Sequence, residues 1–313
     1  MDTNKKLVSI AIPAYKSRHL EEAISSALSQ TYNNIEVIIV DDASPEDIAS
    51  VVRKFSDNRL FYYRNKTNIG GKDPVSNWNK CLSYAKGEYF CLLCDDDKYE
   101  RTFVEEMMSM AISHPDVDVF RSRVKFMDNN SDCYDLFPSS PEFESAYDYL
   151  WNKVSRYRIQ TISEFMLKTE VIRNKKGYIS TPKAWCADEM SICYFAKEHG
   201  ICHTNKTLVS FRMSGENITS DKRKNIVEKI EAEKIFTLWI KDFVVNEEIW
   251  YKESIFKHRQ RSCDIAIPGY ISNANLYLFF KILCNKSQCC ITKKQIAKAM
   301  YLKLSNLLRR IWL

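Results

Sequence analysis

The fold of this chain is decided by one stretch, Gly87-Glu88-Tyr89-Phe90-Cys91-Leu92-Leu93-Cys94-Asp95-Asp96-Asp97-Lys98-Tyr99. An apolar run of strand length starts after Gly87 and ends abruptly in three acids. A short apolar run bounded in this way predicts a strand that is buried on both faces, as in a parallel sheet. Because ligands of open α/β sheets bind beyond the carboxyl ends of the strands, the three acids are candidates for a functional site.

Three adjacent carboxylates repel one another. A hard divalent cation, Mg²⁺ or Mn²⁺, prefers oxygen ligands and would remove that repulsion. The alternative interpretation is a solvated acidic turn that closes a strand. For the stretch taken alone the solvated turn is the better interpretation, because acidic turns are common.

The sequence before Gly87 contains three more strand–helix units. Strands are predicted at residues 7–13, 35–40 and 60–64, and helices at residues 19–30, 45–55 and 75–86. The order β-α-β-α-β-α-β predicts an α/β fold with a doubly wound, mostly parallel sheet. The second strand ends in Asp41 and Asp42, so two acid clusters are expected at one edge of the sheet. That convergence is a stronger signal than either cluster alone.

The rest of the chain predicts a second half of the α/β domain and then a helical region. Helices are predicted at residues 102–113, 145–154 and 190–199, strands at 117–127 and 207–212, and a polar loop at 129–141. The later part is basic and poor in glycine, with candidate helices at residues 225–243, 248–263, 275–284 and 292–311. We therefore predict an α/β domain over residues 1–220, divided near residue 100, and a helical C-terminal region over residues 221–313.

The composition of the chain disfavours some classes of function and favours others. The chain has only seven glycines and neither G-x-G-x-x-G nor G-x-x-x-x-G-K-[ST], which disfavours dinucleotide binding and P-loop chemistry. A net charge of +6, with basic residues concentrated late in the chain, favours an anionic ligand or an anionic membrane surface, and no nucleic-acid recognition motif is present. Eleven cysteines without a signal peptide predict a reducing cytoplasm. No apolar run reaches the length of a membrane-spanning helix.

A series of short motifs carries a family resemblance. They are, in order, Val8-Ser9-Ile10-Ala11-Ile12-Pro13-Ala14-Tyr15, Val40-Asp41-Asp42-Ala43-Ser44, Asn68-Ile69-Gly70, Ala85-Lys86-Gly87-Glu88-Tyr89 and Asp95-Asp96-Asp97. In this order and spacing they resemble the family 2 glycosyltransferases, inverting nucleotide-sugar transferases with the GT-A fold. The resemblance covers about residues 5–215 and does not reach the C-terminal helices, so it makes residues 1–220 a GT-A domain with a nucleotide-sugar half and an acceptor half.

The resemblance implies a set of donor-binding residues, which are Pro13, Ala14, Tyr15, Asp42, Asn68, Asn79 and Asp95. In this family the acid at Asp42 accepts a hydrogen bond from the nucleotide base, and a carboxylate opposite a ring N–H selects a uracil-like edge. The loop at residues 13–15 lies along the nucleoside. For Asn68 and Asn79, turn formation or helix capping is an equally good interpretation.

The resemblance also implies a metal site, because Asp95-Asp96-Asp97 matches the D-x-D region of the family. The implied ligands of Mn²⁺ or Mg²⁺ are Asp96 and Asp97, with Asp96 favoured and Asp95 turned towards the ribose. The metal neutralises charge on the leaving diphosphate. The register is open, since many relatives carry an acid where this chain has Cys94.

The implied catalytic base is one of Asp188 and Glu189. The family has a Glu-Asp pair at the start of a helix in this place, and this chain has the two acids in reverse order. A base there must reach the acceptor hydroxyl. The alternative is an ordinary pair of acids that complements the helix dipole. Arg212 either approaches the diphosphate or lies on the surface.

These features predict a metal-dependent inverting glycosyltransferase. It would move a sugar from a nucleotide-diphosphate donor, a UDP-sugar in particular, to a glycan or lipid-linked acceptor in surface polysaccharide or lipopolysaccharide synthesis. The alternative is a sugar-nucleotide-binding scaffold without turnover, because the sequence departs from the family at Cys94 and at Asp188-Glu189. A nucleotidyltransferase would need a glycine- and arginine-rich loop, which residues 13–18 lack.

The C-terminal segment has its own pattern. Apolar residues recur at three- and four-residue steps on one helical face, and they are Ile296, Met300, Leu304, Leu307, Leu308 and Ile311. Six basic residues and no acid lie in the same segment, which ends near Trp312. This pattern predicts an interfacial helix on an anionic leaflet, at the inner face of the plasma membrane. The alternative is a helix whose apolar face packs on the rest of the protein.

Overall fold

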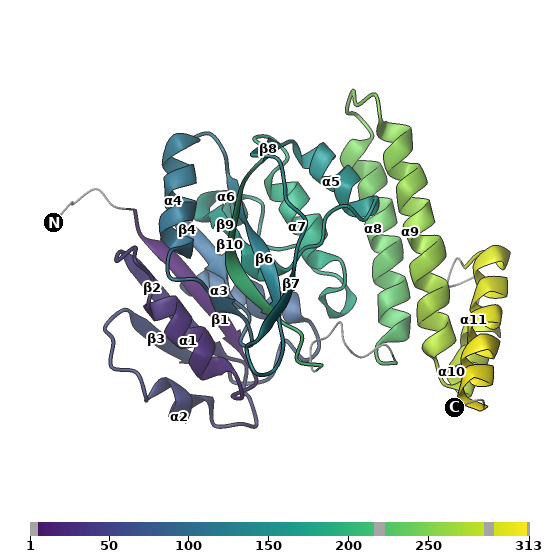
Figure 1. The fold of residues 1–313 in the computed structure, drawn as a ribbon, viewed down its shortest axis with the longest axis horizontal. Helices are drawn as coiled ribbons and strands as arrows, with labels where there is room; N and C mark the ends of the chain where they lie inside the picture. The colour runs from purple at the N-terminus through teal and green to yellow at the C-terminus, as the bar shows by residue number, and fades with distance from the viewer. Residues whose placement is uncertain (1–5, 216–222, 285–290, 312–313) are drawn as a thin grey trace. The chain divides into compact units, whose positions relative to one another are not determined.

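The computed structural model describes residues 6–215, 223–284 and 291–311 (Figure 1). The chain divides into two compact units. The α/β unit consists of Met1–Ser180 and Ala187–Ser214, and the helical unit consists of Thr181–Cys186 and Gly215–Leu313.

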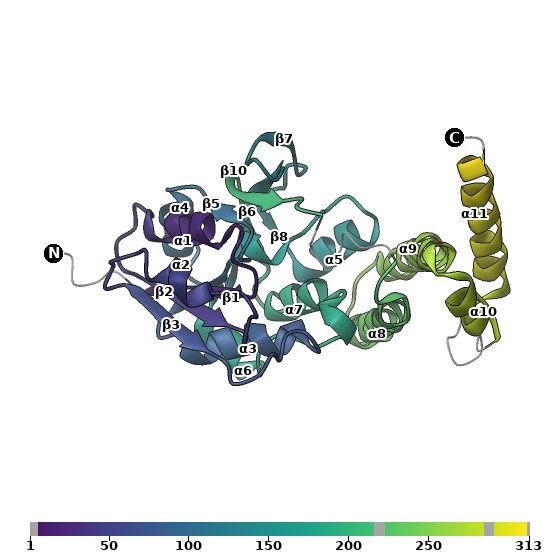
Figure 2. The same cartoon turned by 90° about the horizontal axis from the view of Figure 1, so that it is seen from below.

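One sheet forms the centre of the α/β unit, with helices packed against it (Figure 2). Its strands are β1 (Val8–Ala14), β2 (Ile35–Asp41), β3 (Leu60–Arg64), β4 (Tyr89–Leu92), β5 (Lys98–Tyr99), β6 (Val119–Met127), β7 (Cys133–Leu136), β8 (Phe143–Glu144), β9 (Phe165–Lys168) and β10 (Ile201–Arg212). The order is β3-β2-β1-β4-β9-β6-β10-β5, with β7 beside β6 and β8 beside β10.

The first four strands pair in parallel, so the predicted doubly wound arrangement is confirmed there. Every residue of β2 and β4 is buried, which is the burial expected of strands covered on both faces. Beyond β4 the sheet becomes mixed, because β9 runs antiparallel to both β4 and β6.

The helices of the α/β unit are α1 (Leu20–Leu28), α2 (Ile48–Val52), α3 (Pro74–Tyr84), α4 (Phe103–Ser113), α5 (Ala146–Val154), α6 (Thr169–Asn174) and α7 (Ala187–Phe195), with a 3₁₀ turn η1 (Ile162–Glu164). Helix α1 illustrates how they form. Its apolar residues at helical spacing, among them Leu20, Ile24 and Ala27, are buried in the core against Ile10 and Ile12 of β1.

Three predictions from the sequence differ from the structure. The predicted polar loop at residues 129–141 contains β7, whose residues are all exposed, so no alternating apolar pattern marks it. Strand β10 starts at Ile201 and not at residue 207, because an exposed, irregular stretch interrupts its apolar pattern before Thr207. Strand β9 lies at residues 165–168, where the sequence analysis above predicts neither a strand nor a helix.

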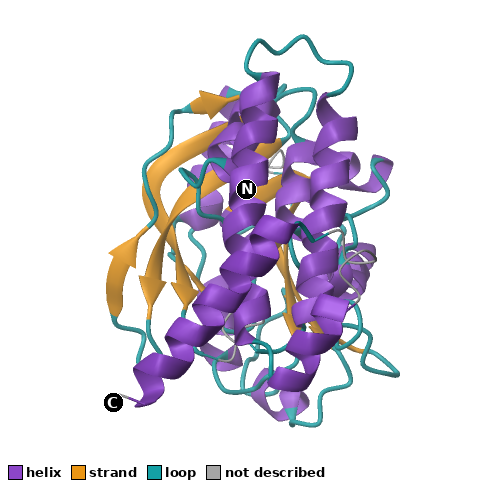
Figure 3. Cartoon of the chain, turned by 90° about the vertical axis from the view of Figure 1, so that its right-hand side faces the viewer, coloured by secondary structure: helices purple, strands orange, loops and turns teal. Residues whose placement is uncertain are grey.

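The helical unit contains α8 (Ile226–Val244), α9 (Lys252–Asn273), α10 (Leu276–Cys284) and α11 (Lys293–Ile311) (Figure 3). Helix α9 continues past the predicted end at residue 263 and through Pro268, since Ile267 and Ile271 are buried in the core of this unit. That core also takes in Ile296 and Ala299 of α11. Among the described residues no helix has the length and apolar character needed to cross a bilayer.

Candidate active site

Hydrogen bonds to Asp95 connect the carboxyl ends of β1 and β4. One oxygen of its carboxylate accepts hydrogen bonds from the backbone N–H groups of Tyr15 and Lys16, each at 2.9 Å. Tyr15 and Lys16 follow β1, and Asp95 follows β4, which pairs with β1 in parallel. The acids therefore lie where the sequence predicted them, at the edge of the sheet that holds the carboxyl ends of the parallel strands.

The three acids of the triplet carry an excess of negative charge. Burial and the neighbouring Asp96 raise the pKa of Asp95 to about 6. Burial raises the pKa of Asp96 although Lys16 opposes it, and burial together with Asp96 raises the pKa of Asp97 well above its usual range. A set of oxygen donors whose charged forms are disfavoured in this way is suited to a hard divalent cation, which would compensate the charge.

Asp96 and Asp97 differ in how they are held. The carboxylate of Asp96 is half-buried, and Ser214 donates to it over 3.4 Å. Asp97 is fully buried, and both of its carboxylate oxygens accept hydrogen bonds, one from Ser163 Oγ at 2.6 Å and one from the backbone N–H of Arg212 at 2.9 Å. Asp97 therefore fixes the turn, while Asp96 is the more accessible carboxylate of the two.

Arg212 is buried, so it is neither a surface arginine nor exposed towards a ligand. Its guanidinium donates to the carbonyl oxygens of Asp96 and Asp128 at 2.8 Å, and it also contacts Glu22 and Ser131 at 3.1 Å. These contacts hold the backbone of the acidic turn against the end of β10.

Asp42 holds the loop that follows β3. Its carboxylate, 2% exposed, accepts hydrogen bonds from Asn65 Nδ2 and the backbone N–H of Ile69 on one oxygen, and from the N–H of Gly70 at 2.7 Å on the other. A Cβ atom at Gly70 would lie 2.8 Å from that second oxygen, so the close approach requires glycine. The second oxygen keeps the capacity to accept one further donor.

The two predicted asparagines make local or backbone contacts. Asn68 is exposed, and its side-chain oxygen accepts from the N–H of Gly71 at 2.6 Å, which is a turn-forming bond. The Asn79 amide pairs with the backbone of Tyr178 through both its oxygen and its nitrogen, at 2.8 and 3.2 Å. The Asn68 contact matches the turn-forming alternative, whereas the Asn79 contact is neither a turn nor a helix cap, because it joins α3 to a residue 99 positions later in the chain.

Strand β1 ends with buried Ala14, and the loop after it begins with Tyr15, which is 41% exposed. Pro13 is the last but one residue of β1 and pairs with Val40, while Ala14 accepts from the N–H of Asp42 at 3.0 Å. The carbonyl of Tyr15 accepts from Ser44 Oγ at 2.5 Å. The three residues therefore stand beside Asp42 and Asp95 at the same edge of the sheet.

The acid pair Asp188 and Glu189 lies in the first turn of α7. Burial and the charge of Glu189 raise the pKa of Asp188 well above its usual range. Burial would raise the pKa of Glu189 too, but Lys153, whose Nζ lies 3.4 Å from Glu189 Oε1, and Asp188 outweigh it and hold that pKa low. The pKa values of the two neighbouring carboxyls are therefore shifted in opposite directions, upward for Asp188 and downward for Glu189.

A five-residue segment, Gln160–Glu164, connects the two acid clusters. Gln160 Nε2 donates to Asp188 Oδ2 at 3.1 Å, and Ser163 donates to Asp97. Glu164 is buried and pairs with Arg121 of β6 at 2.6 Å. The sequence predicts no site residue in this segment, because its pattern has neither helical nor strand periodicity. The signal that existed was a cluster of polar residues, of which Thr161, Ser163 and Glu164 are buried in the fold.

Comparison with known proteins places this site in a family. The family model for Glycosyl transferase family 2 matches residues 9–169. This chain belongs to glycosyl transferase family 2. An uncharacterized glycosyltransferase of Rickettsia typhi is 34% identical over 284 residues, which are 88% of this chain and 85% of the relative. The family 2 assignment drawn from the sequence motifs is confirmed.

Further relatives of this family 2 glycosyltransferase are similar over shorter stretches. The UDP-Glc:alpha-D-GlcNAc-diphosphoundecaprenol beta-1,3-glucosyltransferase WfgD of Escherichia coli is 32% identical over 126 residues, 40% of this chain and 48% of that relative. For WfgD the chain therefore matches about half of the relative's length.

Two solved structures have the same fold as this family 2 glycosyltransferase. TarS 1-349 of S. aureus in complex with UDP-GlcNAc superposes with a TM-score of 0.67 at 15% identity, over 97% of this chain and 92% of that one. The mannosyltransferase PcManGT of Pyrobaculum calidifontis, in complex with GDP-Man and Mn2+, superposes with a TM-score of 0.57 at 15% identity, over 99% of this chain and 88% of that one. The predicted GT-A fold is confirmed.

Among the residues described, no group of three or more His, Cys, Asp or Glu side chains is placed to hold a metal ion. Mg²⁺-type cations are commonly held by one or two carboxylates together with the phosphates of a substrate. The donor set at residues 95–97 fits that mode of binding.

Proposed function

We propose that this glycosyltransferase moves a sugar from a UDP-sugar to a lipid-linked glycan acceptor, with inversion at the anomeric carbon. The observation that carries the proposal is the Gln160–Glu164 segment, which contacts both the acidic triplet after β4 and the acid pair of α7. The relatives support the substrate classes, since one is named for UDP-Glc and a diphosphoundecaprenol acceptor and a structural neighbour is bound to UDP-GlcNAc.

The donor would bind at the edge of the sheet formed by the ends of β1, β2 and β4. The loop of Pro13, Ala14 and Tyr15 would lie along the nucleoside, and Asp42 would accept from the base through its remaining lone pair. Asp95 would support the ribose side, because it already fixes the backbone of Tyr15 and Lys16. Asn68 and Asn79 would act only indirectly, through the turn and the Tyr178 backbone that they hold.

A divalent cation, Mn²⁺ or Mg²⁺, would be held by Asp96 together with the diphosphate of the donor. When bound, it would neutralise charge that develops on the leaving diphosphate. Of the two predicted ligands the geometry favours Asp96, because both oxygens of Asp97 already accept hydrogen bonds from Ser163 and Arg212. Asp97 would contribute by keeping the turn in place.

Asp188 would be the general base. The oxygen of the acceptor hydroxyl attacks the anomeric carbon, its proton passes to Asp188, and the bond to the diphosphate breaks with its electron pair leaving on the diphosphate. The raised pKa of Asp188 makes it the stronger proton acceptor of the pair, and Glu189 remains ionised beside Lys153. The contact from Gln160 Nε2 to Asp188 Oδ2 would orient this carboxyl towards the acceptor hydroxyl.

The test is a transfer assay with the full chain. Labelled UDP-sugars are offered with a lipid-diphosphate sugar acceptor, with and without Mn²⁺, and the release of UDP and the anomeric configuration of the product are measured. We expect metal-dependent transfer with inversion. Mn²⁺-dependent binding of UDP-sugars with no turnover of any donor would replace this function by that of a sugar-nucleotide-binding scaffold.

We also propose that the protein is cytoplasmic and peripheral at the inner face of the plasma membrane, where a lipid-linked acceptor would be found. Large apolar side chains are exposed on α10 and α11, namely Leu276, Tyr277, Phe280, Met300, Tyr301 and Leu304. Part of α11 packs inside the helical unit through Ile296 and Ala299, so only the exposed residues of this helix would contact the membrane. Sedimentation with anionic vesicles tests the proposal: Tyr277→Ser with Phe280→Ser should reduce it, and sedimentation equal to that of the unchanged protein would contradict it.

A further inference from the structure

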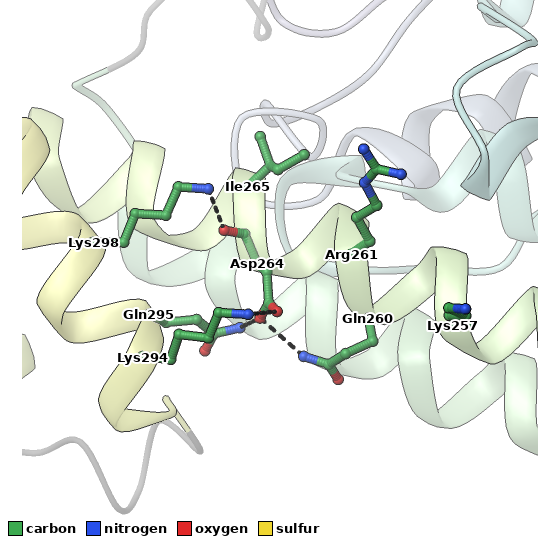
Figure 4. A pocket seen from close by; sticks show the side chains of 8 residues that line it. All are labelled: Lys257, Gln260, Arg261, Asp264, Ile265, Lys294, Gln295 and Lys298. Atoms are coloured by element: carbon green, nitrogen blue, oxygen red, sulfur yellow. Dashed lines mark hydrogen bonds and ion pairs between the residues drawn. The ribbon is translucent and has the colours of Figure 1, made fainter.

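A groove lies between α9 and α11 of the helical unit (Figure 4). Its volume is about 450 Å³, and it is lined by Lys257, Gln260, Arg261, Asp264, Ile265, Lys294, Gln295 and Lys298. Four of the eight lining residues are cationic and one is acidic, so the groove carries a net positive charge.

The single acid of the groove is already engaged. Asp264 Oδ1 accepts from Gln260 Nε2 at 3.0 Å and from Gln295 Nε2 at 2.9 Å, and Lys294 Nζ lies 3.6 Å from Oδ2. Lys298 Nζ donates to the backbone carbonyl of Asp264 at 3.0 Å. Asp264 therefore serves to join α9 to α11, and it does not compensate the charge of the α9 side.

The cations stand in two rows. Lys257 and Arg261 are four residues apart on α9, and Lys294 and Lys298 are four residues apart on α11. Like charges at this spacing destabilise a helix. Figure 4 draws no interaction between Lys257 or Arg261 and the other residues of the groove. An anion in the groove would therefore relieve the repulsion within the α9 row, while Lys294 and Lys298 of the α11 row already contact Asp264.

The start of α11 adds to this charge. Thr292 and Gln295 form a reciprocal cap, with the Gln295 N–H donating to Thr292 Oγ1 at 3.2 Å and the Thr292 N–H donating to Gln295 Oε1 at 3.1 Å. Gln295 is 3% exposed. The first turn of α11 contains no acid, although the positive end of the helix dipole favours negative charge there. The groove thus faces a helix start that favours an anion.

We propose that this groove binds phosphate, and that the phosphate is presented by the headgroup of an anionic phospholipid. Rows of amines and a guanidinium around a helix start are suited to a phosphate group. A lipid is favoured over free phosphate as the ligand, because apolar side chains are exposed beside the groove. Ile265 in the groove is 39% exposed, and Met300 and Leu304 are exposed further along α11. The inference rests on the proposed membrane location and is independent of the sugar-transfer chemistry.

The experiment uses the full chain and vesicles of phosphatidylglycerol mixed with phosphatidylcholine, with pure phosphatidylcholine as the neutral surface. The groove variant is Lys257→Glu with Arg261→Glu. The matched control is Lys241→Glu with Lys281→Glu, two exposed lysines of α8 and α10 outside the groove. Since each basic residue near an anionic leaflet adds roughly 1 kcal/mol of attraction, we expect the groove variant to lower partitioning at least about tenfold. The control should lower it far less.

A second arm identifies the source of the phosphate. Inorganic pyrophosphate is titrated calorimetrically into each variant without vesicles. Binding of pyrophosphate that is lost in the groove variant, together with unchanged vesicle partitioning, would overturn the lipid source. Equal loss of vesicle partitioning in the groove and control variants would overturn the site, because it indicates diffuse charge alone. Release of UDP in solution is measured in all variants, so that a failure of sugar transfer is distinguished from a failure of the groove.

Discussion

The side-chain amide of Gln160 donates to Asp188 Oδ2 at 3.1 Å, and the same amide accepts at its oxygen from the hydroxyl of Tyr149 at 2.5 Å. Tyr149 is completely buried on α5. Because the amide oxygen is occupied by Tyr149, the nitrogen is the part of the amide that faces Asp188. This relationship orients the carboxyl that we propose as the base.

Gln160 should act as a positioning residue. Gln160→Leu removes the donor to Asp188 without adding charge, so kcat should fall roughly tenfold or more, the value of a hydrogen bond to a charged group. The KM for the donor should stay near that of the unchanged enzyme, and the pH profile of kcat should shift. Partial recovery in Gln160→Asn supports positioning, and an unchanged kcat and pH profile in Gln160→Leu would contradict it.

Asp188→Asn keeps the size of the side chain and removes the proton acceptor. We expect transfer to fall by about a hundredfold to ten-thousandfold, the usual contribution of a general base. UDP-sugar affinity should be unchanged, since the base acts on the acceptor. The control is Glu189→Gln. An active Asp188→Asn enzyme beside an inactive Glu189→Gln enzyme would show that Glu189 is the base.

Asp96 and Asp97 should have different roles, Asp96 as a metal ligand and Asp97 as a structural residue. Asp96→Ala should leave the melting temperature near its original value and remove most Mn²⁺-dependent UDP binding. Asp97→Ala should cost on the order of 2 kcal/mol or more of stability, because it leaves the donors of Ser163 and Arg212 unpaired in the interior. The same measurements are made on Asp95→Ala. Unaltered metal-dependent binding in Asp96→Ala would remove that residue from the site.

Gly70→Ala tests the loop at Asp42. The added Cβ would lie 2.8 Å from Asp42 Oδ2, so the loop must shift, at a cost of about 1–3 kcal/mol, and UDP affinity should fall. The control is Gly269→Ala on α9, where an added Cβ meets no atom within 4 Å. Equal UDP affinity in the two variants would show that the loop at Asp42 does not contribute to donor binding.

The stability of the folded protein should fall at acid pH, because His203 is then protonated. This residue is buried against Glu144, Tyr149 and Arg121, and burial lowers its pKa from 6.5 to about 4. The unfolded chain therefore takes up a proton near pH 6.5 while the folded protein does not until about pH 4. The stabilisation is complete above pH 6.5 and is lost as the pH falls towards 4.

The free energy of unfolding should fall by about 3 kcal/mol as this transition is completed. Urea unfolding at a series of pH values measures it. His203→Gln should flatten the dependence in this range, and a pH dependence equal to that of the unchanged protein would show that other groups cause it.

The local patterns of the sequence determined the strands and helices of the first half and the order of its motifs. The continuous apolar runs of β1, β2 and β4 had to be buried on both faces, so the pairing of these strands in parallel placed Asp42 and Asp95 at one edge of the sheet. These properties depend on neighbours in the chain, which periodicity reports directly.

Only the tertiary structure decided which polar groups meet. Asn79 and the backbone of Tyr178 are 99 residues apart in sequence, and Arg212 and Asp97 are 115 residues apart. Strand β9 enters the sheet between β4 and β6 and carries the segment Gln160–Glu164 to both acid clusters. The cations of α9 and α11 form a groove because the buried side chains of those helices pack together. No local pattern encodes such contacts, because they depend on the path of the whole chain through the core.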